Sequence, residues 1–469
     1  MAFMLATADT IVAIATPPGE GGVGIVRLSG PRALEVGRAL VRPARRTTWP
    51  AHRLIYGHVV DEASGRRVDE VLAVYMAAPH TYTAEDVFEI HCHGGPAPLG
   101  AVVELALRHG ARPAGRGEFT LRAFLNGRLD LSQAEAVLDV VRARTPTALH
   151  VAVEHLSGGL SRRLRPVVDA LMGVLAFLEA SIDFVEEGIP EAASATLLAQ
   201  LGQAEEGLQA LLATARHGII LREGLRAVLA GAPNVGKSSL LNRLLRADRA
   251  IVTPVAGTTR DTVEEPANIR DVPVYLVDTA GLTETDDPVE HLGVQRSRSA
   301  IAAADLLLLV ADASRPLDGR DREAFGMARA LAPATPALLV LNKADLPRVL
   351  DPADARALLA DPPPASTVTL SAATGEGLDE LEEAIAAVAL GGTTLTPDTA
   401  LIDNARHRRA LEEALDALRA TCMGLGGGAP LDLVCSDLRA AVTALGAITG
   451  QDVTDDLLSR IFGQFCIGK

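Results

Sequence analysis

The stretch from Gly231 to Ser238 has the residue types and spacing of a phosphate-binding loop. It reads Gly-Ala-Pro-Asn-Val-Gly-Lys-Ser, which matches the pattern G-x-x-x-x-G-K-[ST]. A strand-like apolar segment precedes it and a leucine-rich helical segment follows it, as this pattern requires. Backbone N–H groups of such a loop surround phosphates, Lys237 brings a positive charge to the outer phosphates, and the Ser238 hydroxyl can ligate Mg²⁺. We expect a nucleoside triphosphate to bind here.

Three later segments indicate which nucleotide binds. Asp278-Thr-Ala-Gly281 ends an apolar strand and would place a carboxylate beside the metal and a backbone N–H beside the terminal phosphate. Asn342-Lys-Ala-Asp345 ends another strand, and Asp345 can accept two hydrogens from the guanine edge. Ser371-Ala-Ala373 would bring a backbone N–H near the guanine oxygen. The four segments in this order predict GTP rather than ATP, and the region resembles a translation-factor-type GTPase.

One position departs from the commonest GTPase arrangement. Leu282 follows the Asp278–Gly281 segment, where Ras-like enzymes carry the glutamine that orients the attacking water. The residue types alone leave several replacements open, and these are Asn234, Glu284, Asp286, Asp287 and Glu290. The segment Ile251–Asp261 carries threonines typical of a first switch, one of which reaches Mg²⁺ when GTP is bound.

The apolar pattern predicts a multidomain protein with α/β and all-α parts. Short apolar runs predict a mixed α/β domain at the N-terminus, with strands at Thr10–Thr16, Val23–Leu28, Val71–Ala77 and Val87–His91 and a helix at Ala97–His109. Long helices follow, then strands and helices of a doubly wound parallel sheet, then helices again. Because the two helical stretches would bury their apolar stripes best against each other, the Ras-like GTPase domain reads as an insertion in one discontinuous helical domain. The expected boundaries are 1–127, 128–222, 223–391 and 392–469.

Length and composition narrow the class of protein. The chain has 469 residues and 48% hydrophobic residues, which favours several folded domains. The formal charge of −15 argues against a broad nucleic-acid footprint, so an RNA substrate would call for a basic partner. The cysteines at 92, 422, 435 and 466 show no metal or disulfide spacing. We expect no membrane span and no secretory signal, and hence a cytoplasmic protein.

Motifs along the whole length make the chain similar to the MnmE (TrmE) family of tRNA modification GTPases. Near the N-terminus these are DTIVAIATPPGEGGVGIVRLSG, TAEDVFEIHCHGG and RPAGRGEFTLRAFLNGRLDLSQAEAV. In the middle they are GAPNVGKSSLLN, TPVAGTTRD and DTAGL, and at the end DDLLSRIFGQFCIGK.

This resemblance implies a folate-binding N-terminal domain that also forms a homodimer. It further implies a K⁺-activated GTP hydrolase that works with a FAD-dependent MnmG-type protein in a heterotetramer. Together they would add an aminomethyl-type or carboxymethylaminomethyl group to carbon five of the wobble uridine in tRNA, using a one-carbon tetrahydrofolate. The alternative is a G-protein switch that assists ribosome or RNA assembly without modification chemistry. The folate residues and the FCIGK tail argue against that alternative.

The resemblance also assigns site residues. It places K⁺ on Asn234, Thr253, Val255 and Thr258, Mg²⁺ on Ser238 and Thr259, and folate on Arg27, Glu89, Arg128 and Lys469. Glu290 aligns with the acid that orients the water and, with Lys237, is the expected catalytic residue. The residues expected to contact GTP are Asn234, Val235, Gly236, Lys237, Ser238, Ser239, Thr253, Thr259, Asp278, Thr279, Ala280, Gly281, Asn342, Lys343, Asp345, Ser371 and Ala372.

Three other features carry weaker interpretations. His91-Cys92-His93 favours a core strand over a metal site, because alternate strand residues point to opposite faces. Cys466 is either a reactive thiol beside the folate pocket or a small apolar residue packing the last helix, and the terminal CIGK fits a prenylation signal poorly. The basic run Arg38, Arg42, Arg45, Arg46 and Arg53 reads as a solvated loop, with contact to tRNA as the alternative.

Overall fold

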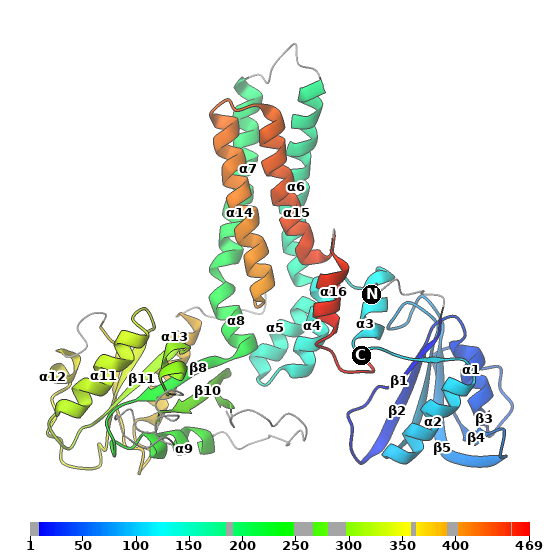
Figure 1. Ribbon diagram of the computed structural model, residues 1–469, viewed down its shortest axis with the longest axis horizontal. Helices are drawn as coiled ribbons and strands as arrows, with labels where there is room; N and C mark the ends of the chain where they lie inside the picture. The colour runs from blue at the N-terminus through cyan, green and yellow to red at the C-terminus, as the bar shows by residue number, and fades with distance from the viewer. Residues whose placement is uncertain are drawn as a thin grey trace. The chain divides into compact units, whose positions relative to one another are not determined.

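A computed structural model describes residues 9–183, 191–247, 266–279, 297–357, 363–391, 402–451 and 453–469 (Figure 1). Internal contacts divide the chain into two compact units. One comprises Met1–Val141, Val153–Glu205 and Glu413–Lys469, and the other comprises Arg142–Ala152 and Glu206–Glu412. Within the described ranges, no helix has both the length and the apolar character needed to cross a bilayer.

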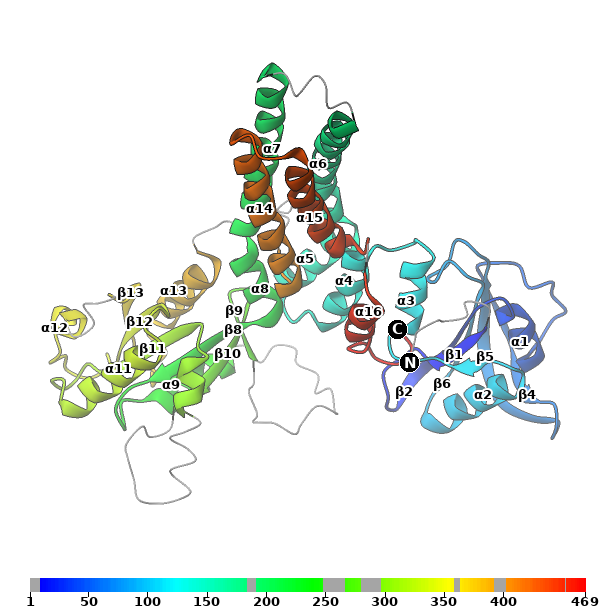
Figure 2. The same ribbon diagram turned by 45° about the horizontal axis from the view of Figure 1, so that its top comes forward.

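The N-terminal domain is built on a seven-stranded sheet in the order β3-β4-β5-β6-β2-β1-β7. Neighbouring strands are antiparallel except for the parallel pair β1 and β7. Its strands are β1 (Ile11–Ile14), β2 (Gly21–Ser29), β3 (Val41–Pro43), β4 (Arg53–Asp61), β5 (Arg66–Met76), β6 (Val87–Gly94) and β7 (Arg112–Pro113). Helices α1 (Ala33–Leu40) and α2 (Pro96–Arg108) cover one face, where alternate residues such as Val26, Leu28 and Phe88 form the core (Figure 2).

The predicted strands and helix of this domain are confirmed as β1, β2, β5, β6 and α2, with ends shifted by a few residues. Strands β3, β4 and β7 were not predicted. β3 and β7 have only three and two residues. β4 begins at Arg53, ends at Asp61 and contains Gly57, so its apolar run is too interrupted to be recognised as a strand from the sequence.

The helical part contains α3 (Glu118–Leu125), α4 (Leu131–Arg142), α5 (Pro146–Leu156), α6 (Gly159–Asp183), α7 (Glu191–Ala213), α14 (Ala405–Gly426), α15 (Leu431–Thr449) and α16 (Asp455–Phe462). Helices from before and after the GTPase segment lie side by side, as Figures 1 and 2 both show for α6, α7, α14 and α15. Ion pairs Arg439–Glu179 and Arg419–Glu205 join them. The predicted discontinuous helical domain is confirmed.

The GTPase domain has a six-stranded sheet in the order β13-β12-β11-β8-β10-β9. Its elements are α8 (Ala215–Glu223), β8 (Leu225–Ala230), α9 (Lys237–Ala247), β9 (Pro266–Ile269), β10 (Val272–Asp278), β11 (Leu306–Asp312), α11 (Gly319–Leu331), β12 (Ala337–Asn342), α12 (Pro352–Ala357), β13 (Ser366–Thr369) and α13 (Leu378–Leu390). Helices α9 and α13 bury one face, and α11 and α12 bury the other. The predicted parallel sheet is confirmed for β8, β10, β11, β12 and β13, and β9, which was not predicted, adds an antiparallel edge strand beside β10.

Candidate functional site

The phosphate loop lies at the carboxyl edge of the GTPase sheet. It leaves β8 and enters α9, whose first residue is Lys237. Because β8, β10, β11, β12 and β13 are parallel, the segments that follow them meet at the same edge. This topology brings the predicted nucleotide-binding segments together although they are spread over more than a hundred residues.

Lys237 is buried within its own loop. Its ammonium group donates to the carbonyl oxygens of Gly231 at 2.8 Å and Ala232 at 2.9 Å. Burial lowers the pKa of Lys237, and the nearby Asp278 carboxylate acts in the opposite direction. The backbone of Gly236 has φ +96°, and an added Cβ would lie 2.2 Å from Asn342 Nδ2. The loop therefore needs glycine at 236, both for the backbone angle and for the close approach.

Ser238 and Asp278 form a polar pair suited to a divalent cation. Ser238 Oγ donates to Asp278 Oδ2 at 2.6 Å. The other oxygen, Asp278 Oδ1, is buried and has no hydrogen-bond partner among the described residues. Thr279 Oγ donates to the Leu229 carbonyl at 2.6 Å, which fixes the end of β10. An unsatisfied carboxylate oxygen beside a hydroxyl is the donor set that Mg²⁺ prefers.

Asn342 joins the base-recognition segments to the phosphate loop. Its Nδ2 donates to the Val235 carbonyl at 2.8 Å, and its Oδ1 accepts from the Ala372 N–H at 3.0 Å. Ser371 Oγ donates to Asp345 Oδ1 at 2.6 Å. Asp345 is exposed, so its carboxylate is accessible to a guanine edge.

Asp312 is a residue of this site that the sequence analysis missed. It ends β11, is almost completely buried, and pairs with Lys343 Nζ at 2.6 Å. The backbone of Lys343 has φ +68°, in the left-handed region, and the ion pair with Asp312 holds its ammonium group in place. Apolar residues before Asp312 predicted a strand, but no motif marked its last residue as a partner of Lys343.

Several predicted residues fall outside the described ranges. These are Thr253, Val255, Thr258, Thr259, Ala280, Gly281 and Glu290. Their roles stay predictions. Of the four residues assigned to K⁺, the structure describes Asn234, which is exposed and has φ +63°.

A second polar cluster lies on the N-terminal sheet. Arg27 Nε donates to Glu89 Oε1 at 2.7 Å across β2 and β6, and His91 Nε2 lies 3.4 Å from Glu89 Oε2. Burial alone would raise the pKa of Glu89, but His91 and Arg27 lower it below its usual value. Glu89 is therefore an anionic acceptor at neutral pH.

Tyr82 connects the predicted folate residues, although no motif singled it out. The guanidinium carbons of Arg27 and Arg128 lie 5.5 Å and 5.0 Å from its ring centroid. Arg128 Nη1 also donates to the Tyr82 carbonyl, and the Tyr82 hydroxyl lies 2.8 Å from Thr120 Oγ1. Burial raises the pKa of Tyr82. The structure thus brings Arg27, which pairs with Glu89, and Arg128 to the same aromatic ring.

The C-terminal tail packs on the N-terminal domain and carries Lys469 toward this cluster. Ile467 bridges to Arg116, and the Gly117 N–H donates to the Cys466 carbonyl at 3.4 Å. Gly468 has φ +98°, and a Cβ there would lie 2.1 Å from the Ile14 carbonyl oxygen, so only glycine fits. Burial lowers the pKa of Lys469, and the positive charge of Arg27 acts in the same direction.

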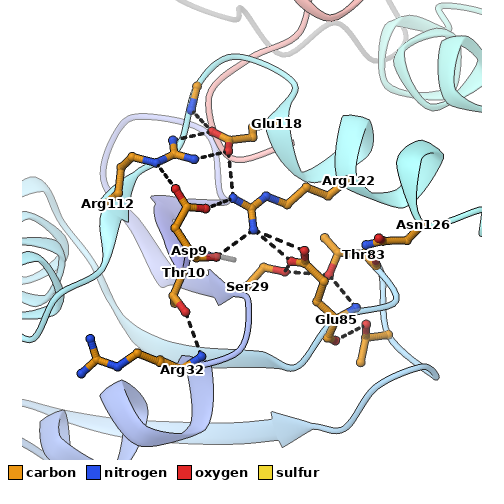
Figure 3. Close-up of polar contacts among 12 residues, drawn as sticks. Asp9, Thr10, Ser29, Arg32, Thr83, Glu85, Arg112, Glu118, Arg122 and Asn126 are labelled. Carbon is orange, nitrogen blue, oxygen red and sulfur yellow. Dashed lines mark hydrogen bonds and ion pairs between the residues drawn. The ribbon is translucent and has the colours of Figure 1, made fainter. Parts of the chain in front are cut away.

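An ionic network holds α3 in place (Figure 3). This helix carries Thr120, the partner of Tyr82, and it follows Gly117, which contacts the tail. Arg122 is completely buried and contacts the carboxylates of Asp9, Glu85 and Glu118. Arg112 Nη2 pairs with Glu118 Oε1 at 2.6 Å. Because the network members come from four segments, they fix α3 against the sheet.

The structure also bears on the interpretations of Cys92 and Cys466. Cys92 is buried, and burial raises its pKa to about 12, as expected for a core strand. The part of the chain that the structure describes contains no group of three possible metal ligands among His, Cys, Asp and Glu. Cys466 is exposed and lies beyond α16, so the interpretation that it packs the last helix is wrong.

Two family models together span nearly the whole chain. The model of the MnmE helical domain matches residues 131–466, and that of the GTP-binding protein TrmE N-terminus matches residues 10–128. The chain belongs to the MnmE family. It is 51% identical to the tRNA modification GTPase MnmE of Chloroflexus aurantiacus, over 98% of this chain and 100% of that protein. It is 50% identical to the MnmE of Roseiflexus sp. strain RS-1, over 98% of this chain and 99% of that protein.

Solved structures are similar to this chain over a shorter range. Aquifex aeolicus Era Y63A bound to GDP.AlF4- is 30% identical, with 41% of this chain and 66% of that chain covered and a TM-score of 0.28. Membership of the MnmE family rests on the family models and the full-length relatives.

Proposed function

We propose that this chain is a K⁺-activated GTPase that modifies carbon five of the wobble uridine in tRNA. It works with a FAD-dependent MnmG-type partner and a one-carbon tetrahydrofolate, in the cytoplasm. The observation that carries the proposal is the presence, in one member of the MnmE family, of two separate sites. One has the geometry of a guanine-nucleotide site, and the other is a cationic cluster around Tyr82.

The GTPase residues perform distinct tasks. Lys237 neutralises charge on the outer phosphates and releases its loop carbonyls when nucleotide binds. Asp345 selects guanine, and the Asn342 amide keeps the base segments aligned with the phosphate loop. Ser238 and Thr259 would hold Mg²⁺, which neutralises developing phosphate charge. The unsatisfied Asp278 oxygen supports this placement.

The proposed potassium site replaces a protein cation. Asn234, Thr253, Val255 and Thr258 would hold K⁺, which supplies positive charge where other GTPases receive an arginine finger. The oxygen atoms that these four residues can offer, including the Asn234 amide oxygen, suit a weakly hydrated monovalent cation. Glu290 would orient the attacking water, because Leu282 cannot do so.

The cluster around Tyr82 suits a reduced folate. A folate carries a glutamate tail with carboxylates, and Arg27, Arg128 and Lys469 offer three positive charges for them. Glu89 accepts hydrogen bonds and suits the N–H groups of a pteridine ring. Burial and then the charge of Arg27 lower the pKa of Lys469, and a bound carboxylate would offset both effects.

The N-terminal domain also offers a surface for the proposed homodimer. Leu54, Tyr56 and Leu72 lie on the sheet face opposite α1 and α2, and each is between 43% and 57% exposed. Tyr56 lies directly opposite Leu72 on the neighbouring strand, so the apolar residues are contiguous. A contiguous exposed apolar face favours association with a second copy.

Reconstitution tests the proposal directly. Unmodified tRNA would be incubated with this chain, the FAD-dependent partner, GTP, one-carbon tetrahydrofolate and K⁺, and its wobble nucleosides analysed by mass. The proposal predicts a mass increase at the wobble uridine that disappears when GTP or the folate is omitted. GTP hydrolysis without any modified uridine would support the alternative, an assembly factor without modification chemistry.

A further inference from the structure

A strongly basic edge stands out on an acidic protein. Residues 32–53 contain six arginines and one glutamate, a formal charge of +5, whereas the whole chain has a formal charge of −15. The only glutamate, Glu35, is paired with Arg32. Five arginines therefore concentrate unneutralised charge, and these are Arg38, Arg42, Arg45, Arg46 and Arg53.

The structure places these arginines at the β3 end of the N-terminal sheet. Arg38 lies on α1, Arg42 on the edge strand β3 and Arg53 at the start of β4, while Arg45 and Arg46 lie in the connection between the strands. The arginines are solvated as expected, but three of the five lie on a helix or a strand rather than in a loop. All five side chains are exposed, and none forms an ion pair with another residue that the structure describes.

The connection that carries Arg45 and Arg46 is anchored at both ends and in the middle. Trp49, the only tryptophan of the chain, is 7% exposed, and its ring centroid lies 5.0 Å from that of Phe88 in the core. Arg38 Nη2 donates to the Thr48 carbonyl at 3.2 Å. The Ala44 and His52 N–H groups donate to β4 and β5.

Two residues of this connection also have unusual backbone angles. Trp49 and His52 have φ +57° and +58°, a region that bulky residues rarely adopt. Such strain persists only where the surrounding structure imposes it, and it is frequent at functional sites. The connection between β3 and β4 is therefore held in one conformation, in which the side chains of Arg45 and Arg46 are exposed.

We propose that this arginine edge, defined by Arg38, Arg42, Arg45, Arg46 and Arg53, binds backbone phosphates of the tRNA substrate. The proposal rests on the proposed function in tRNA modification. Arginine forms paired hydrogen bonds to phosphate, and its charge releases counterions from RNA. On a chain of net charge −15, a local charge of +5 favours the approach of RNA at this edge.

Two pairs of substitutions test the edge in the full-length protein. These are Arg45→Gln with Arg46→Gln, and Arg42→Gln with Arg53→Gln. The matched control is Arg320→Gln with Arg322→Gln, two exposed arginines of α11. The measurement is the Kd for unmodified tRNA by fluorescence anisotropy, over a series of salt concentrations. Each test pair should weaken binding roughly tenfold at 0.1 M salt and reduce the slope of log K against log salt by about 1.5.

The control pair should change neither quantity, and GTP hydrolysis should be unchanged in all variants. Unchanged tRNA affinity in both test pairs would overturn the proposal while leaving the proposed function intact. The proposal would also be overturned if the test pairs lost binding to anionic lipid vesicles but bound tRNA as tightly as wild type. If the wild-type chain binds no tRNA and reconstitution gives no modified uridine, the proposed function itself fails.

Discussion

The nucleotide site and the proposed folate cluster, formed by Arg27, Tyr82, Glu89, Arg128 and Lys469, are assembled differently. The described nucleotide residues come from short motifs, each placed directly after a strand of one parallel sheet. The folate cluster draws Arg27, Tyr82, Glu89 and Arg128 from separate segments, and Lys469 from the far end of the chain. Each motif of the first site is encoded locally, whereas the second cluster depends on the packing of the tail and α3 on the N-terminal sheet.

This difference predicts that a substitution can impair one site and leave the other intact. A substitution in the phosphate loop removes a contact to the nucleotide and leaves the N-terminal domain untouched. A substitution in the folate cluster or its supports changes folate binding and leaves basal GTP hydrolysis untouched. The predictions below run from the largest expected effect to the smallest.

Lys237→Ala should have the largest effect. Lys237 is the buried ammonium group of the phosphate loop, so its removal leaves the outer phosphates without their positive charge. We expect kcat for GTP hydrolysis to fall about 10²–10³-fold. Steady-state phosphate release measures this loss. Folate affinity, measured on the same sample, should match wild type, and a parallel loss of folate binding would show that the sites are not separable.

Asp345→Asn should invert the preference for the base. The carboxylate accepts hydrogens from guanine, whereas an amide can donate to the extra oxygen of xanthine. We expect the affinity for GTP to fall roughly a hundredfold relative to xanthosine triphosphate. Competition binding with both nucleotides measures the ratio. Retained preference for GTP would place base recognition elsewhere.

Arg27→Ala should weaken the folate site without affecting hydrolysis. The substitution removes a cation that contacts both Glu89 and the Tyr82 ring. We expect a roughly thirtyfold loss of affinity for a reduced folate, the size of one lost charged hydrogen bond. Calorimetry provides the Kd. Arg32→Ala is the matched control, because Arg32 is an exposed arginine of the same domain that pairs only with Glu35 among the described residues.

Replacing K⁺ with Na⁺ should slow GTP hydrolysis about tenfold, with nucleotide affinity nearly unchanged. The reason is that Na⁺ is smaller and more strongly hydrated than K⁺, so it would replace K⁺ poorly at the proposed site. Rates in matched KCl and NaCl buffers measure the effect, and folate affinity serves as the internal control. Equal rates in both salts would remove the K⁺ assignment.

The smallest effect on activity is expected from the ionic network of α3. Burial alone would raise the pKa of Glu118, but Arg112, the Gly115 N–H and Arg122 lower it below its usual value. The stabilisation is therefore present above about pH 4.3, the unperturbed value, and lost as pH falls through the folded pKa. We expect the free energy of unfolding to fall on acidification below that pH. Glu118→Gln should cost about 1–3 kcal/mol at pH 7 and flatten this dependence in urea titrations.

The locally encoded site was the more predictable from sequence. Gly236, Lys237, Asn342 and Ser371 lie within motifs whose spacing implies their contacts, and the strand before each motif was visible as an apolar run. Asp312 was missed because its partnership with Lys343 crosses between two strands.

The residues of the proposed folate cluster were assigned only through resemblance to the family, and their role in folate binding stays a prediction. Nothing in spacing links Arg27 to Lys469, because their approach depends on Gly468 fitting against the Ile14 carbonyl. Tyr82 was missed for the same physical reason, since its position depends on Thr120 of α3. The antiparallel β9 was missed because a strand of four residues next to a hairpin turn is too short to show an alternation of apolar and polar residues.

Complementation with separated variants tests the central claim, that one chain joins two independent sites in a single tRNA modification. Cells lacking the gene would receive wild type, Lys237→Ala, Arg27→Ala or Arg32→Ala, and their wobble nucleosides would be analysed by mass. We predict that wild type and Arg32→Ala restore the modified uridine, whereas Lys237→Ala and Arg27→Ala each fail although the proteins accumulate normally. Full restoration by Arg27→Ala would contradict the account.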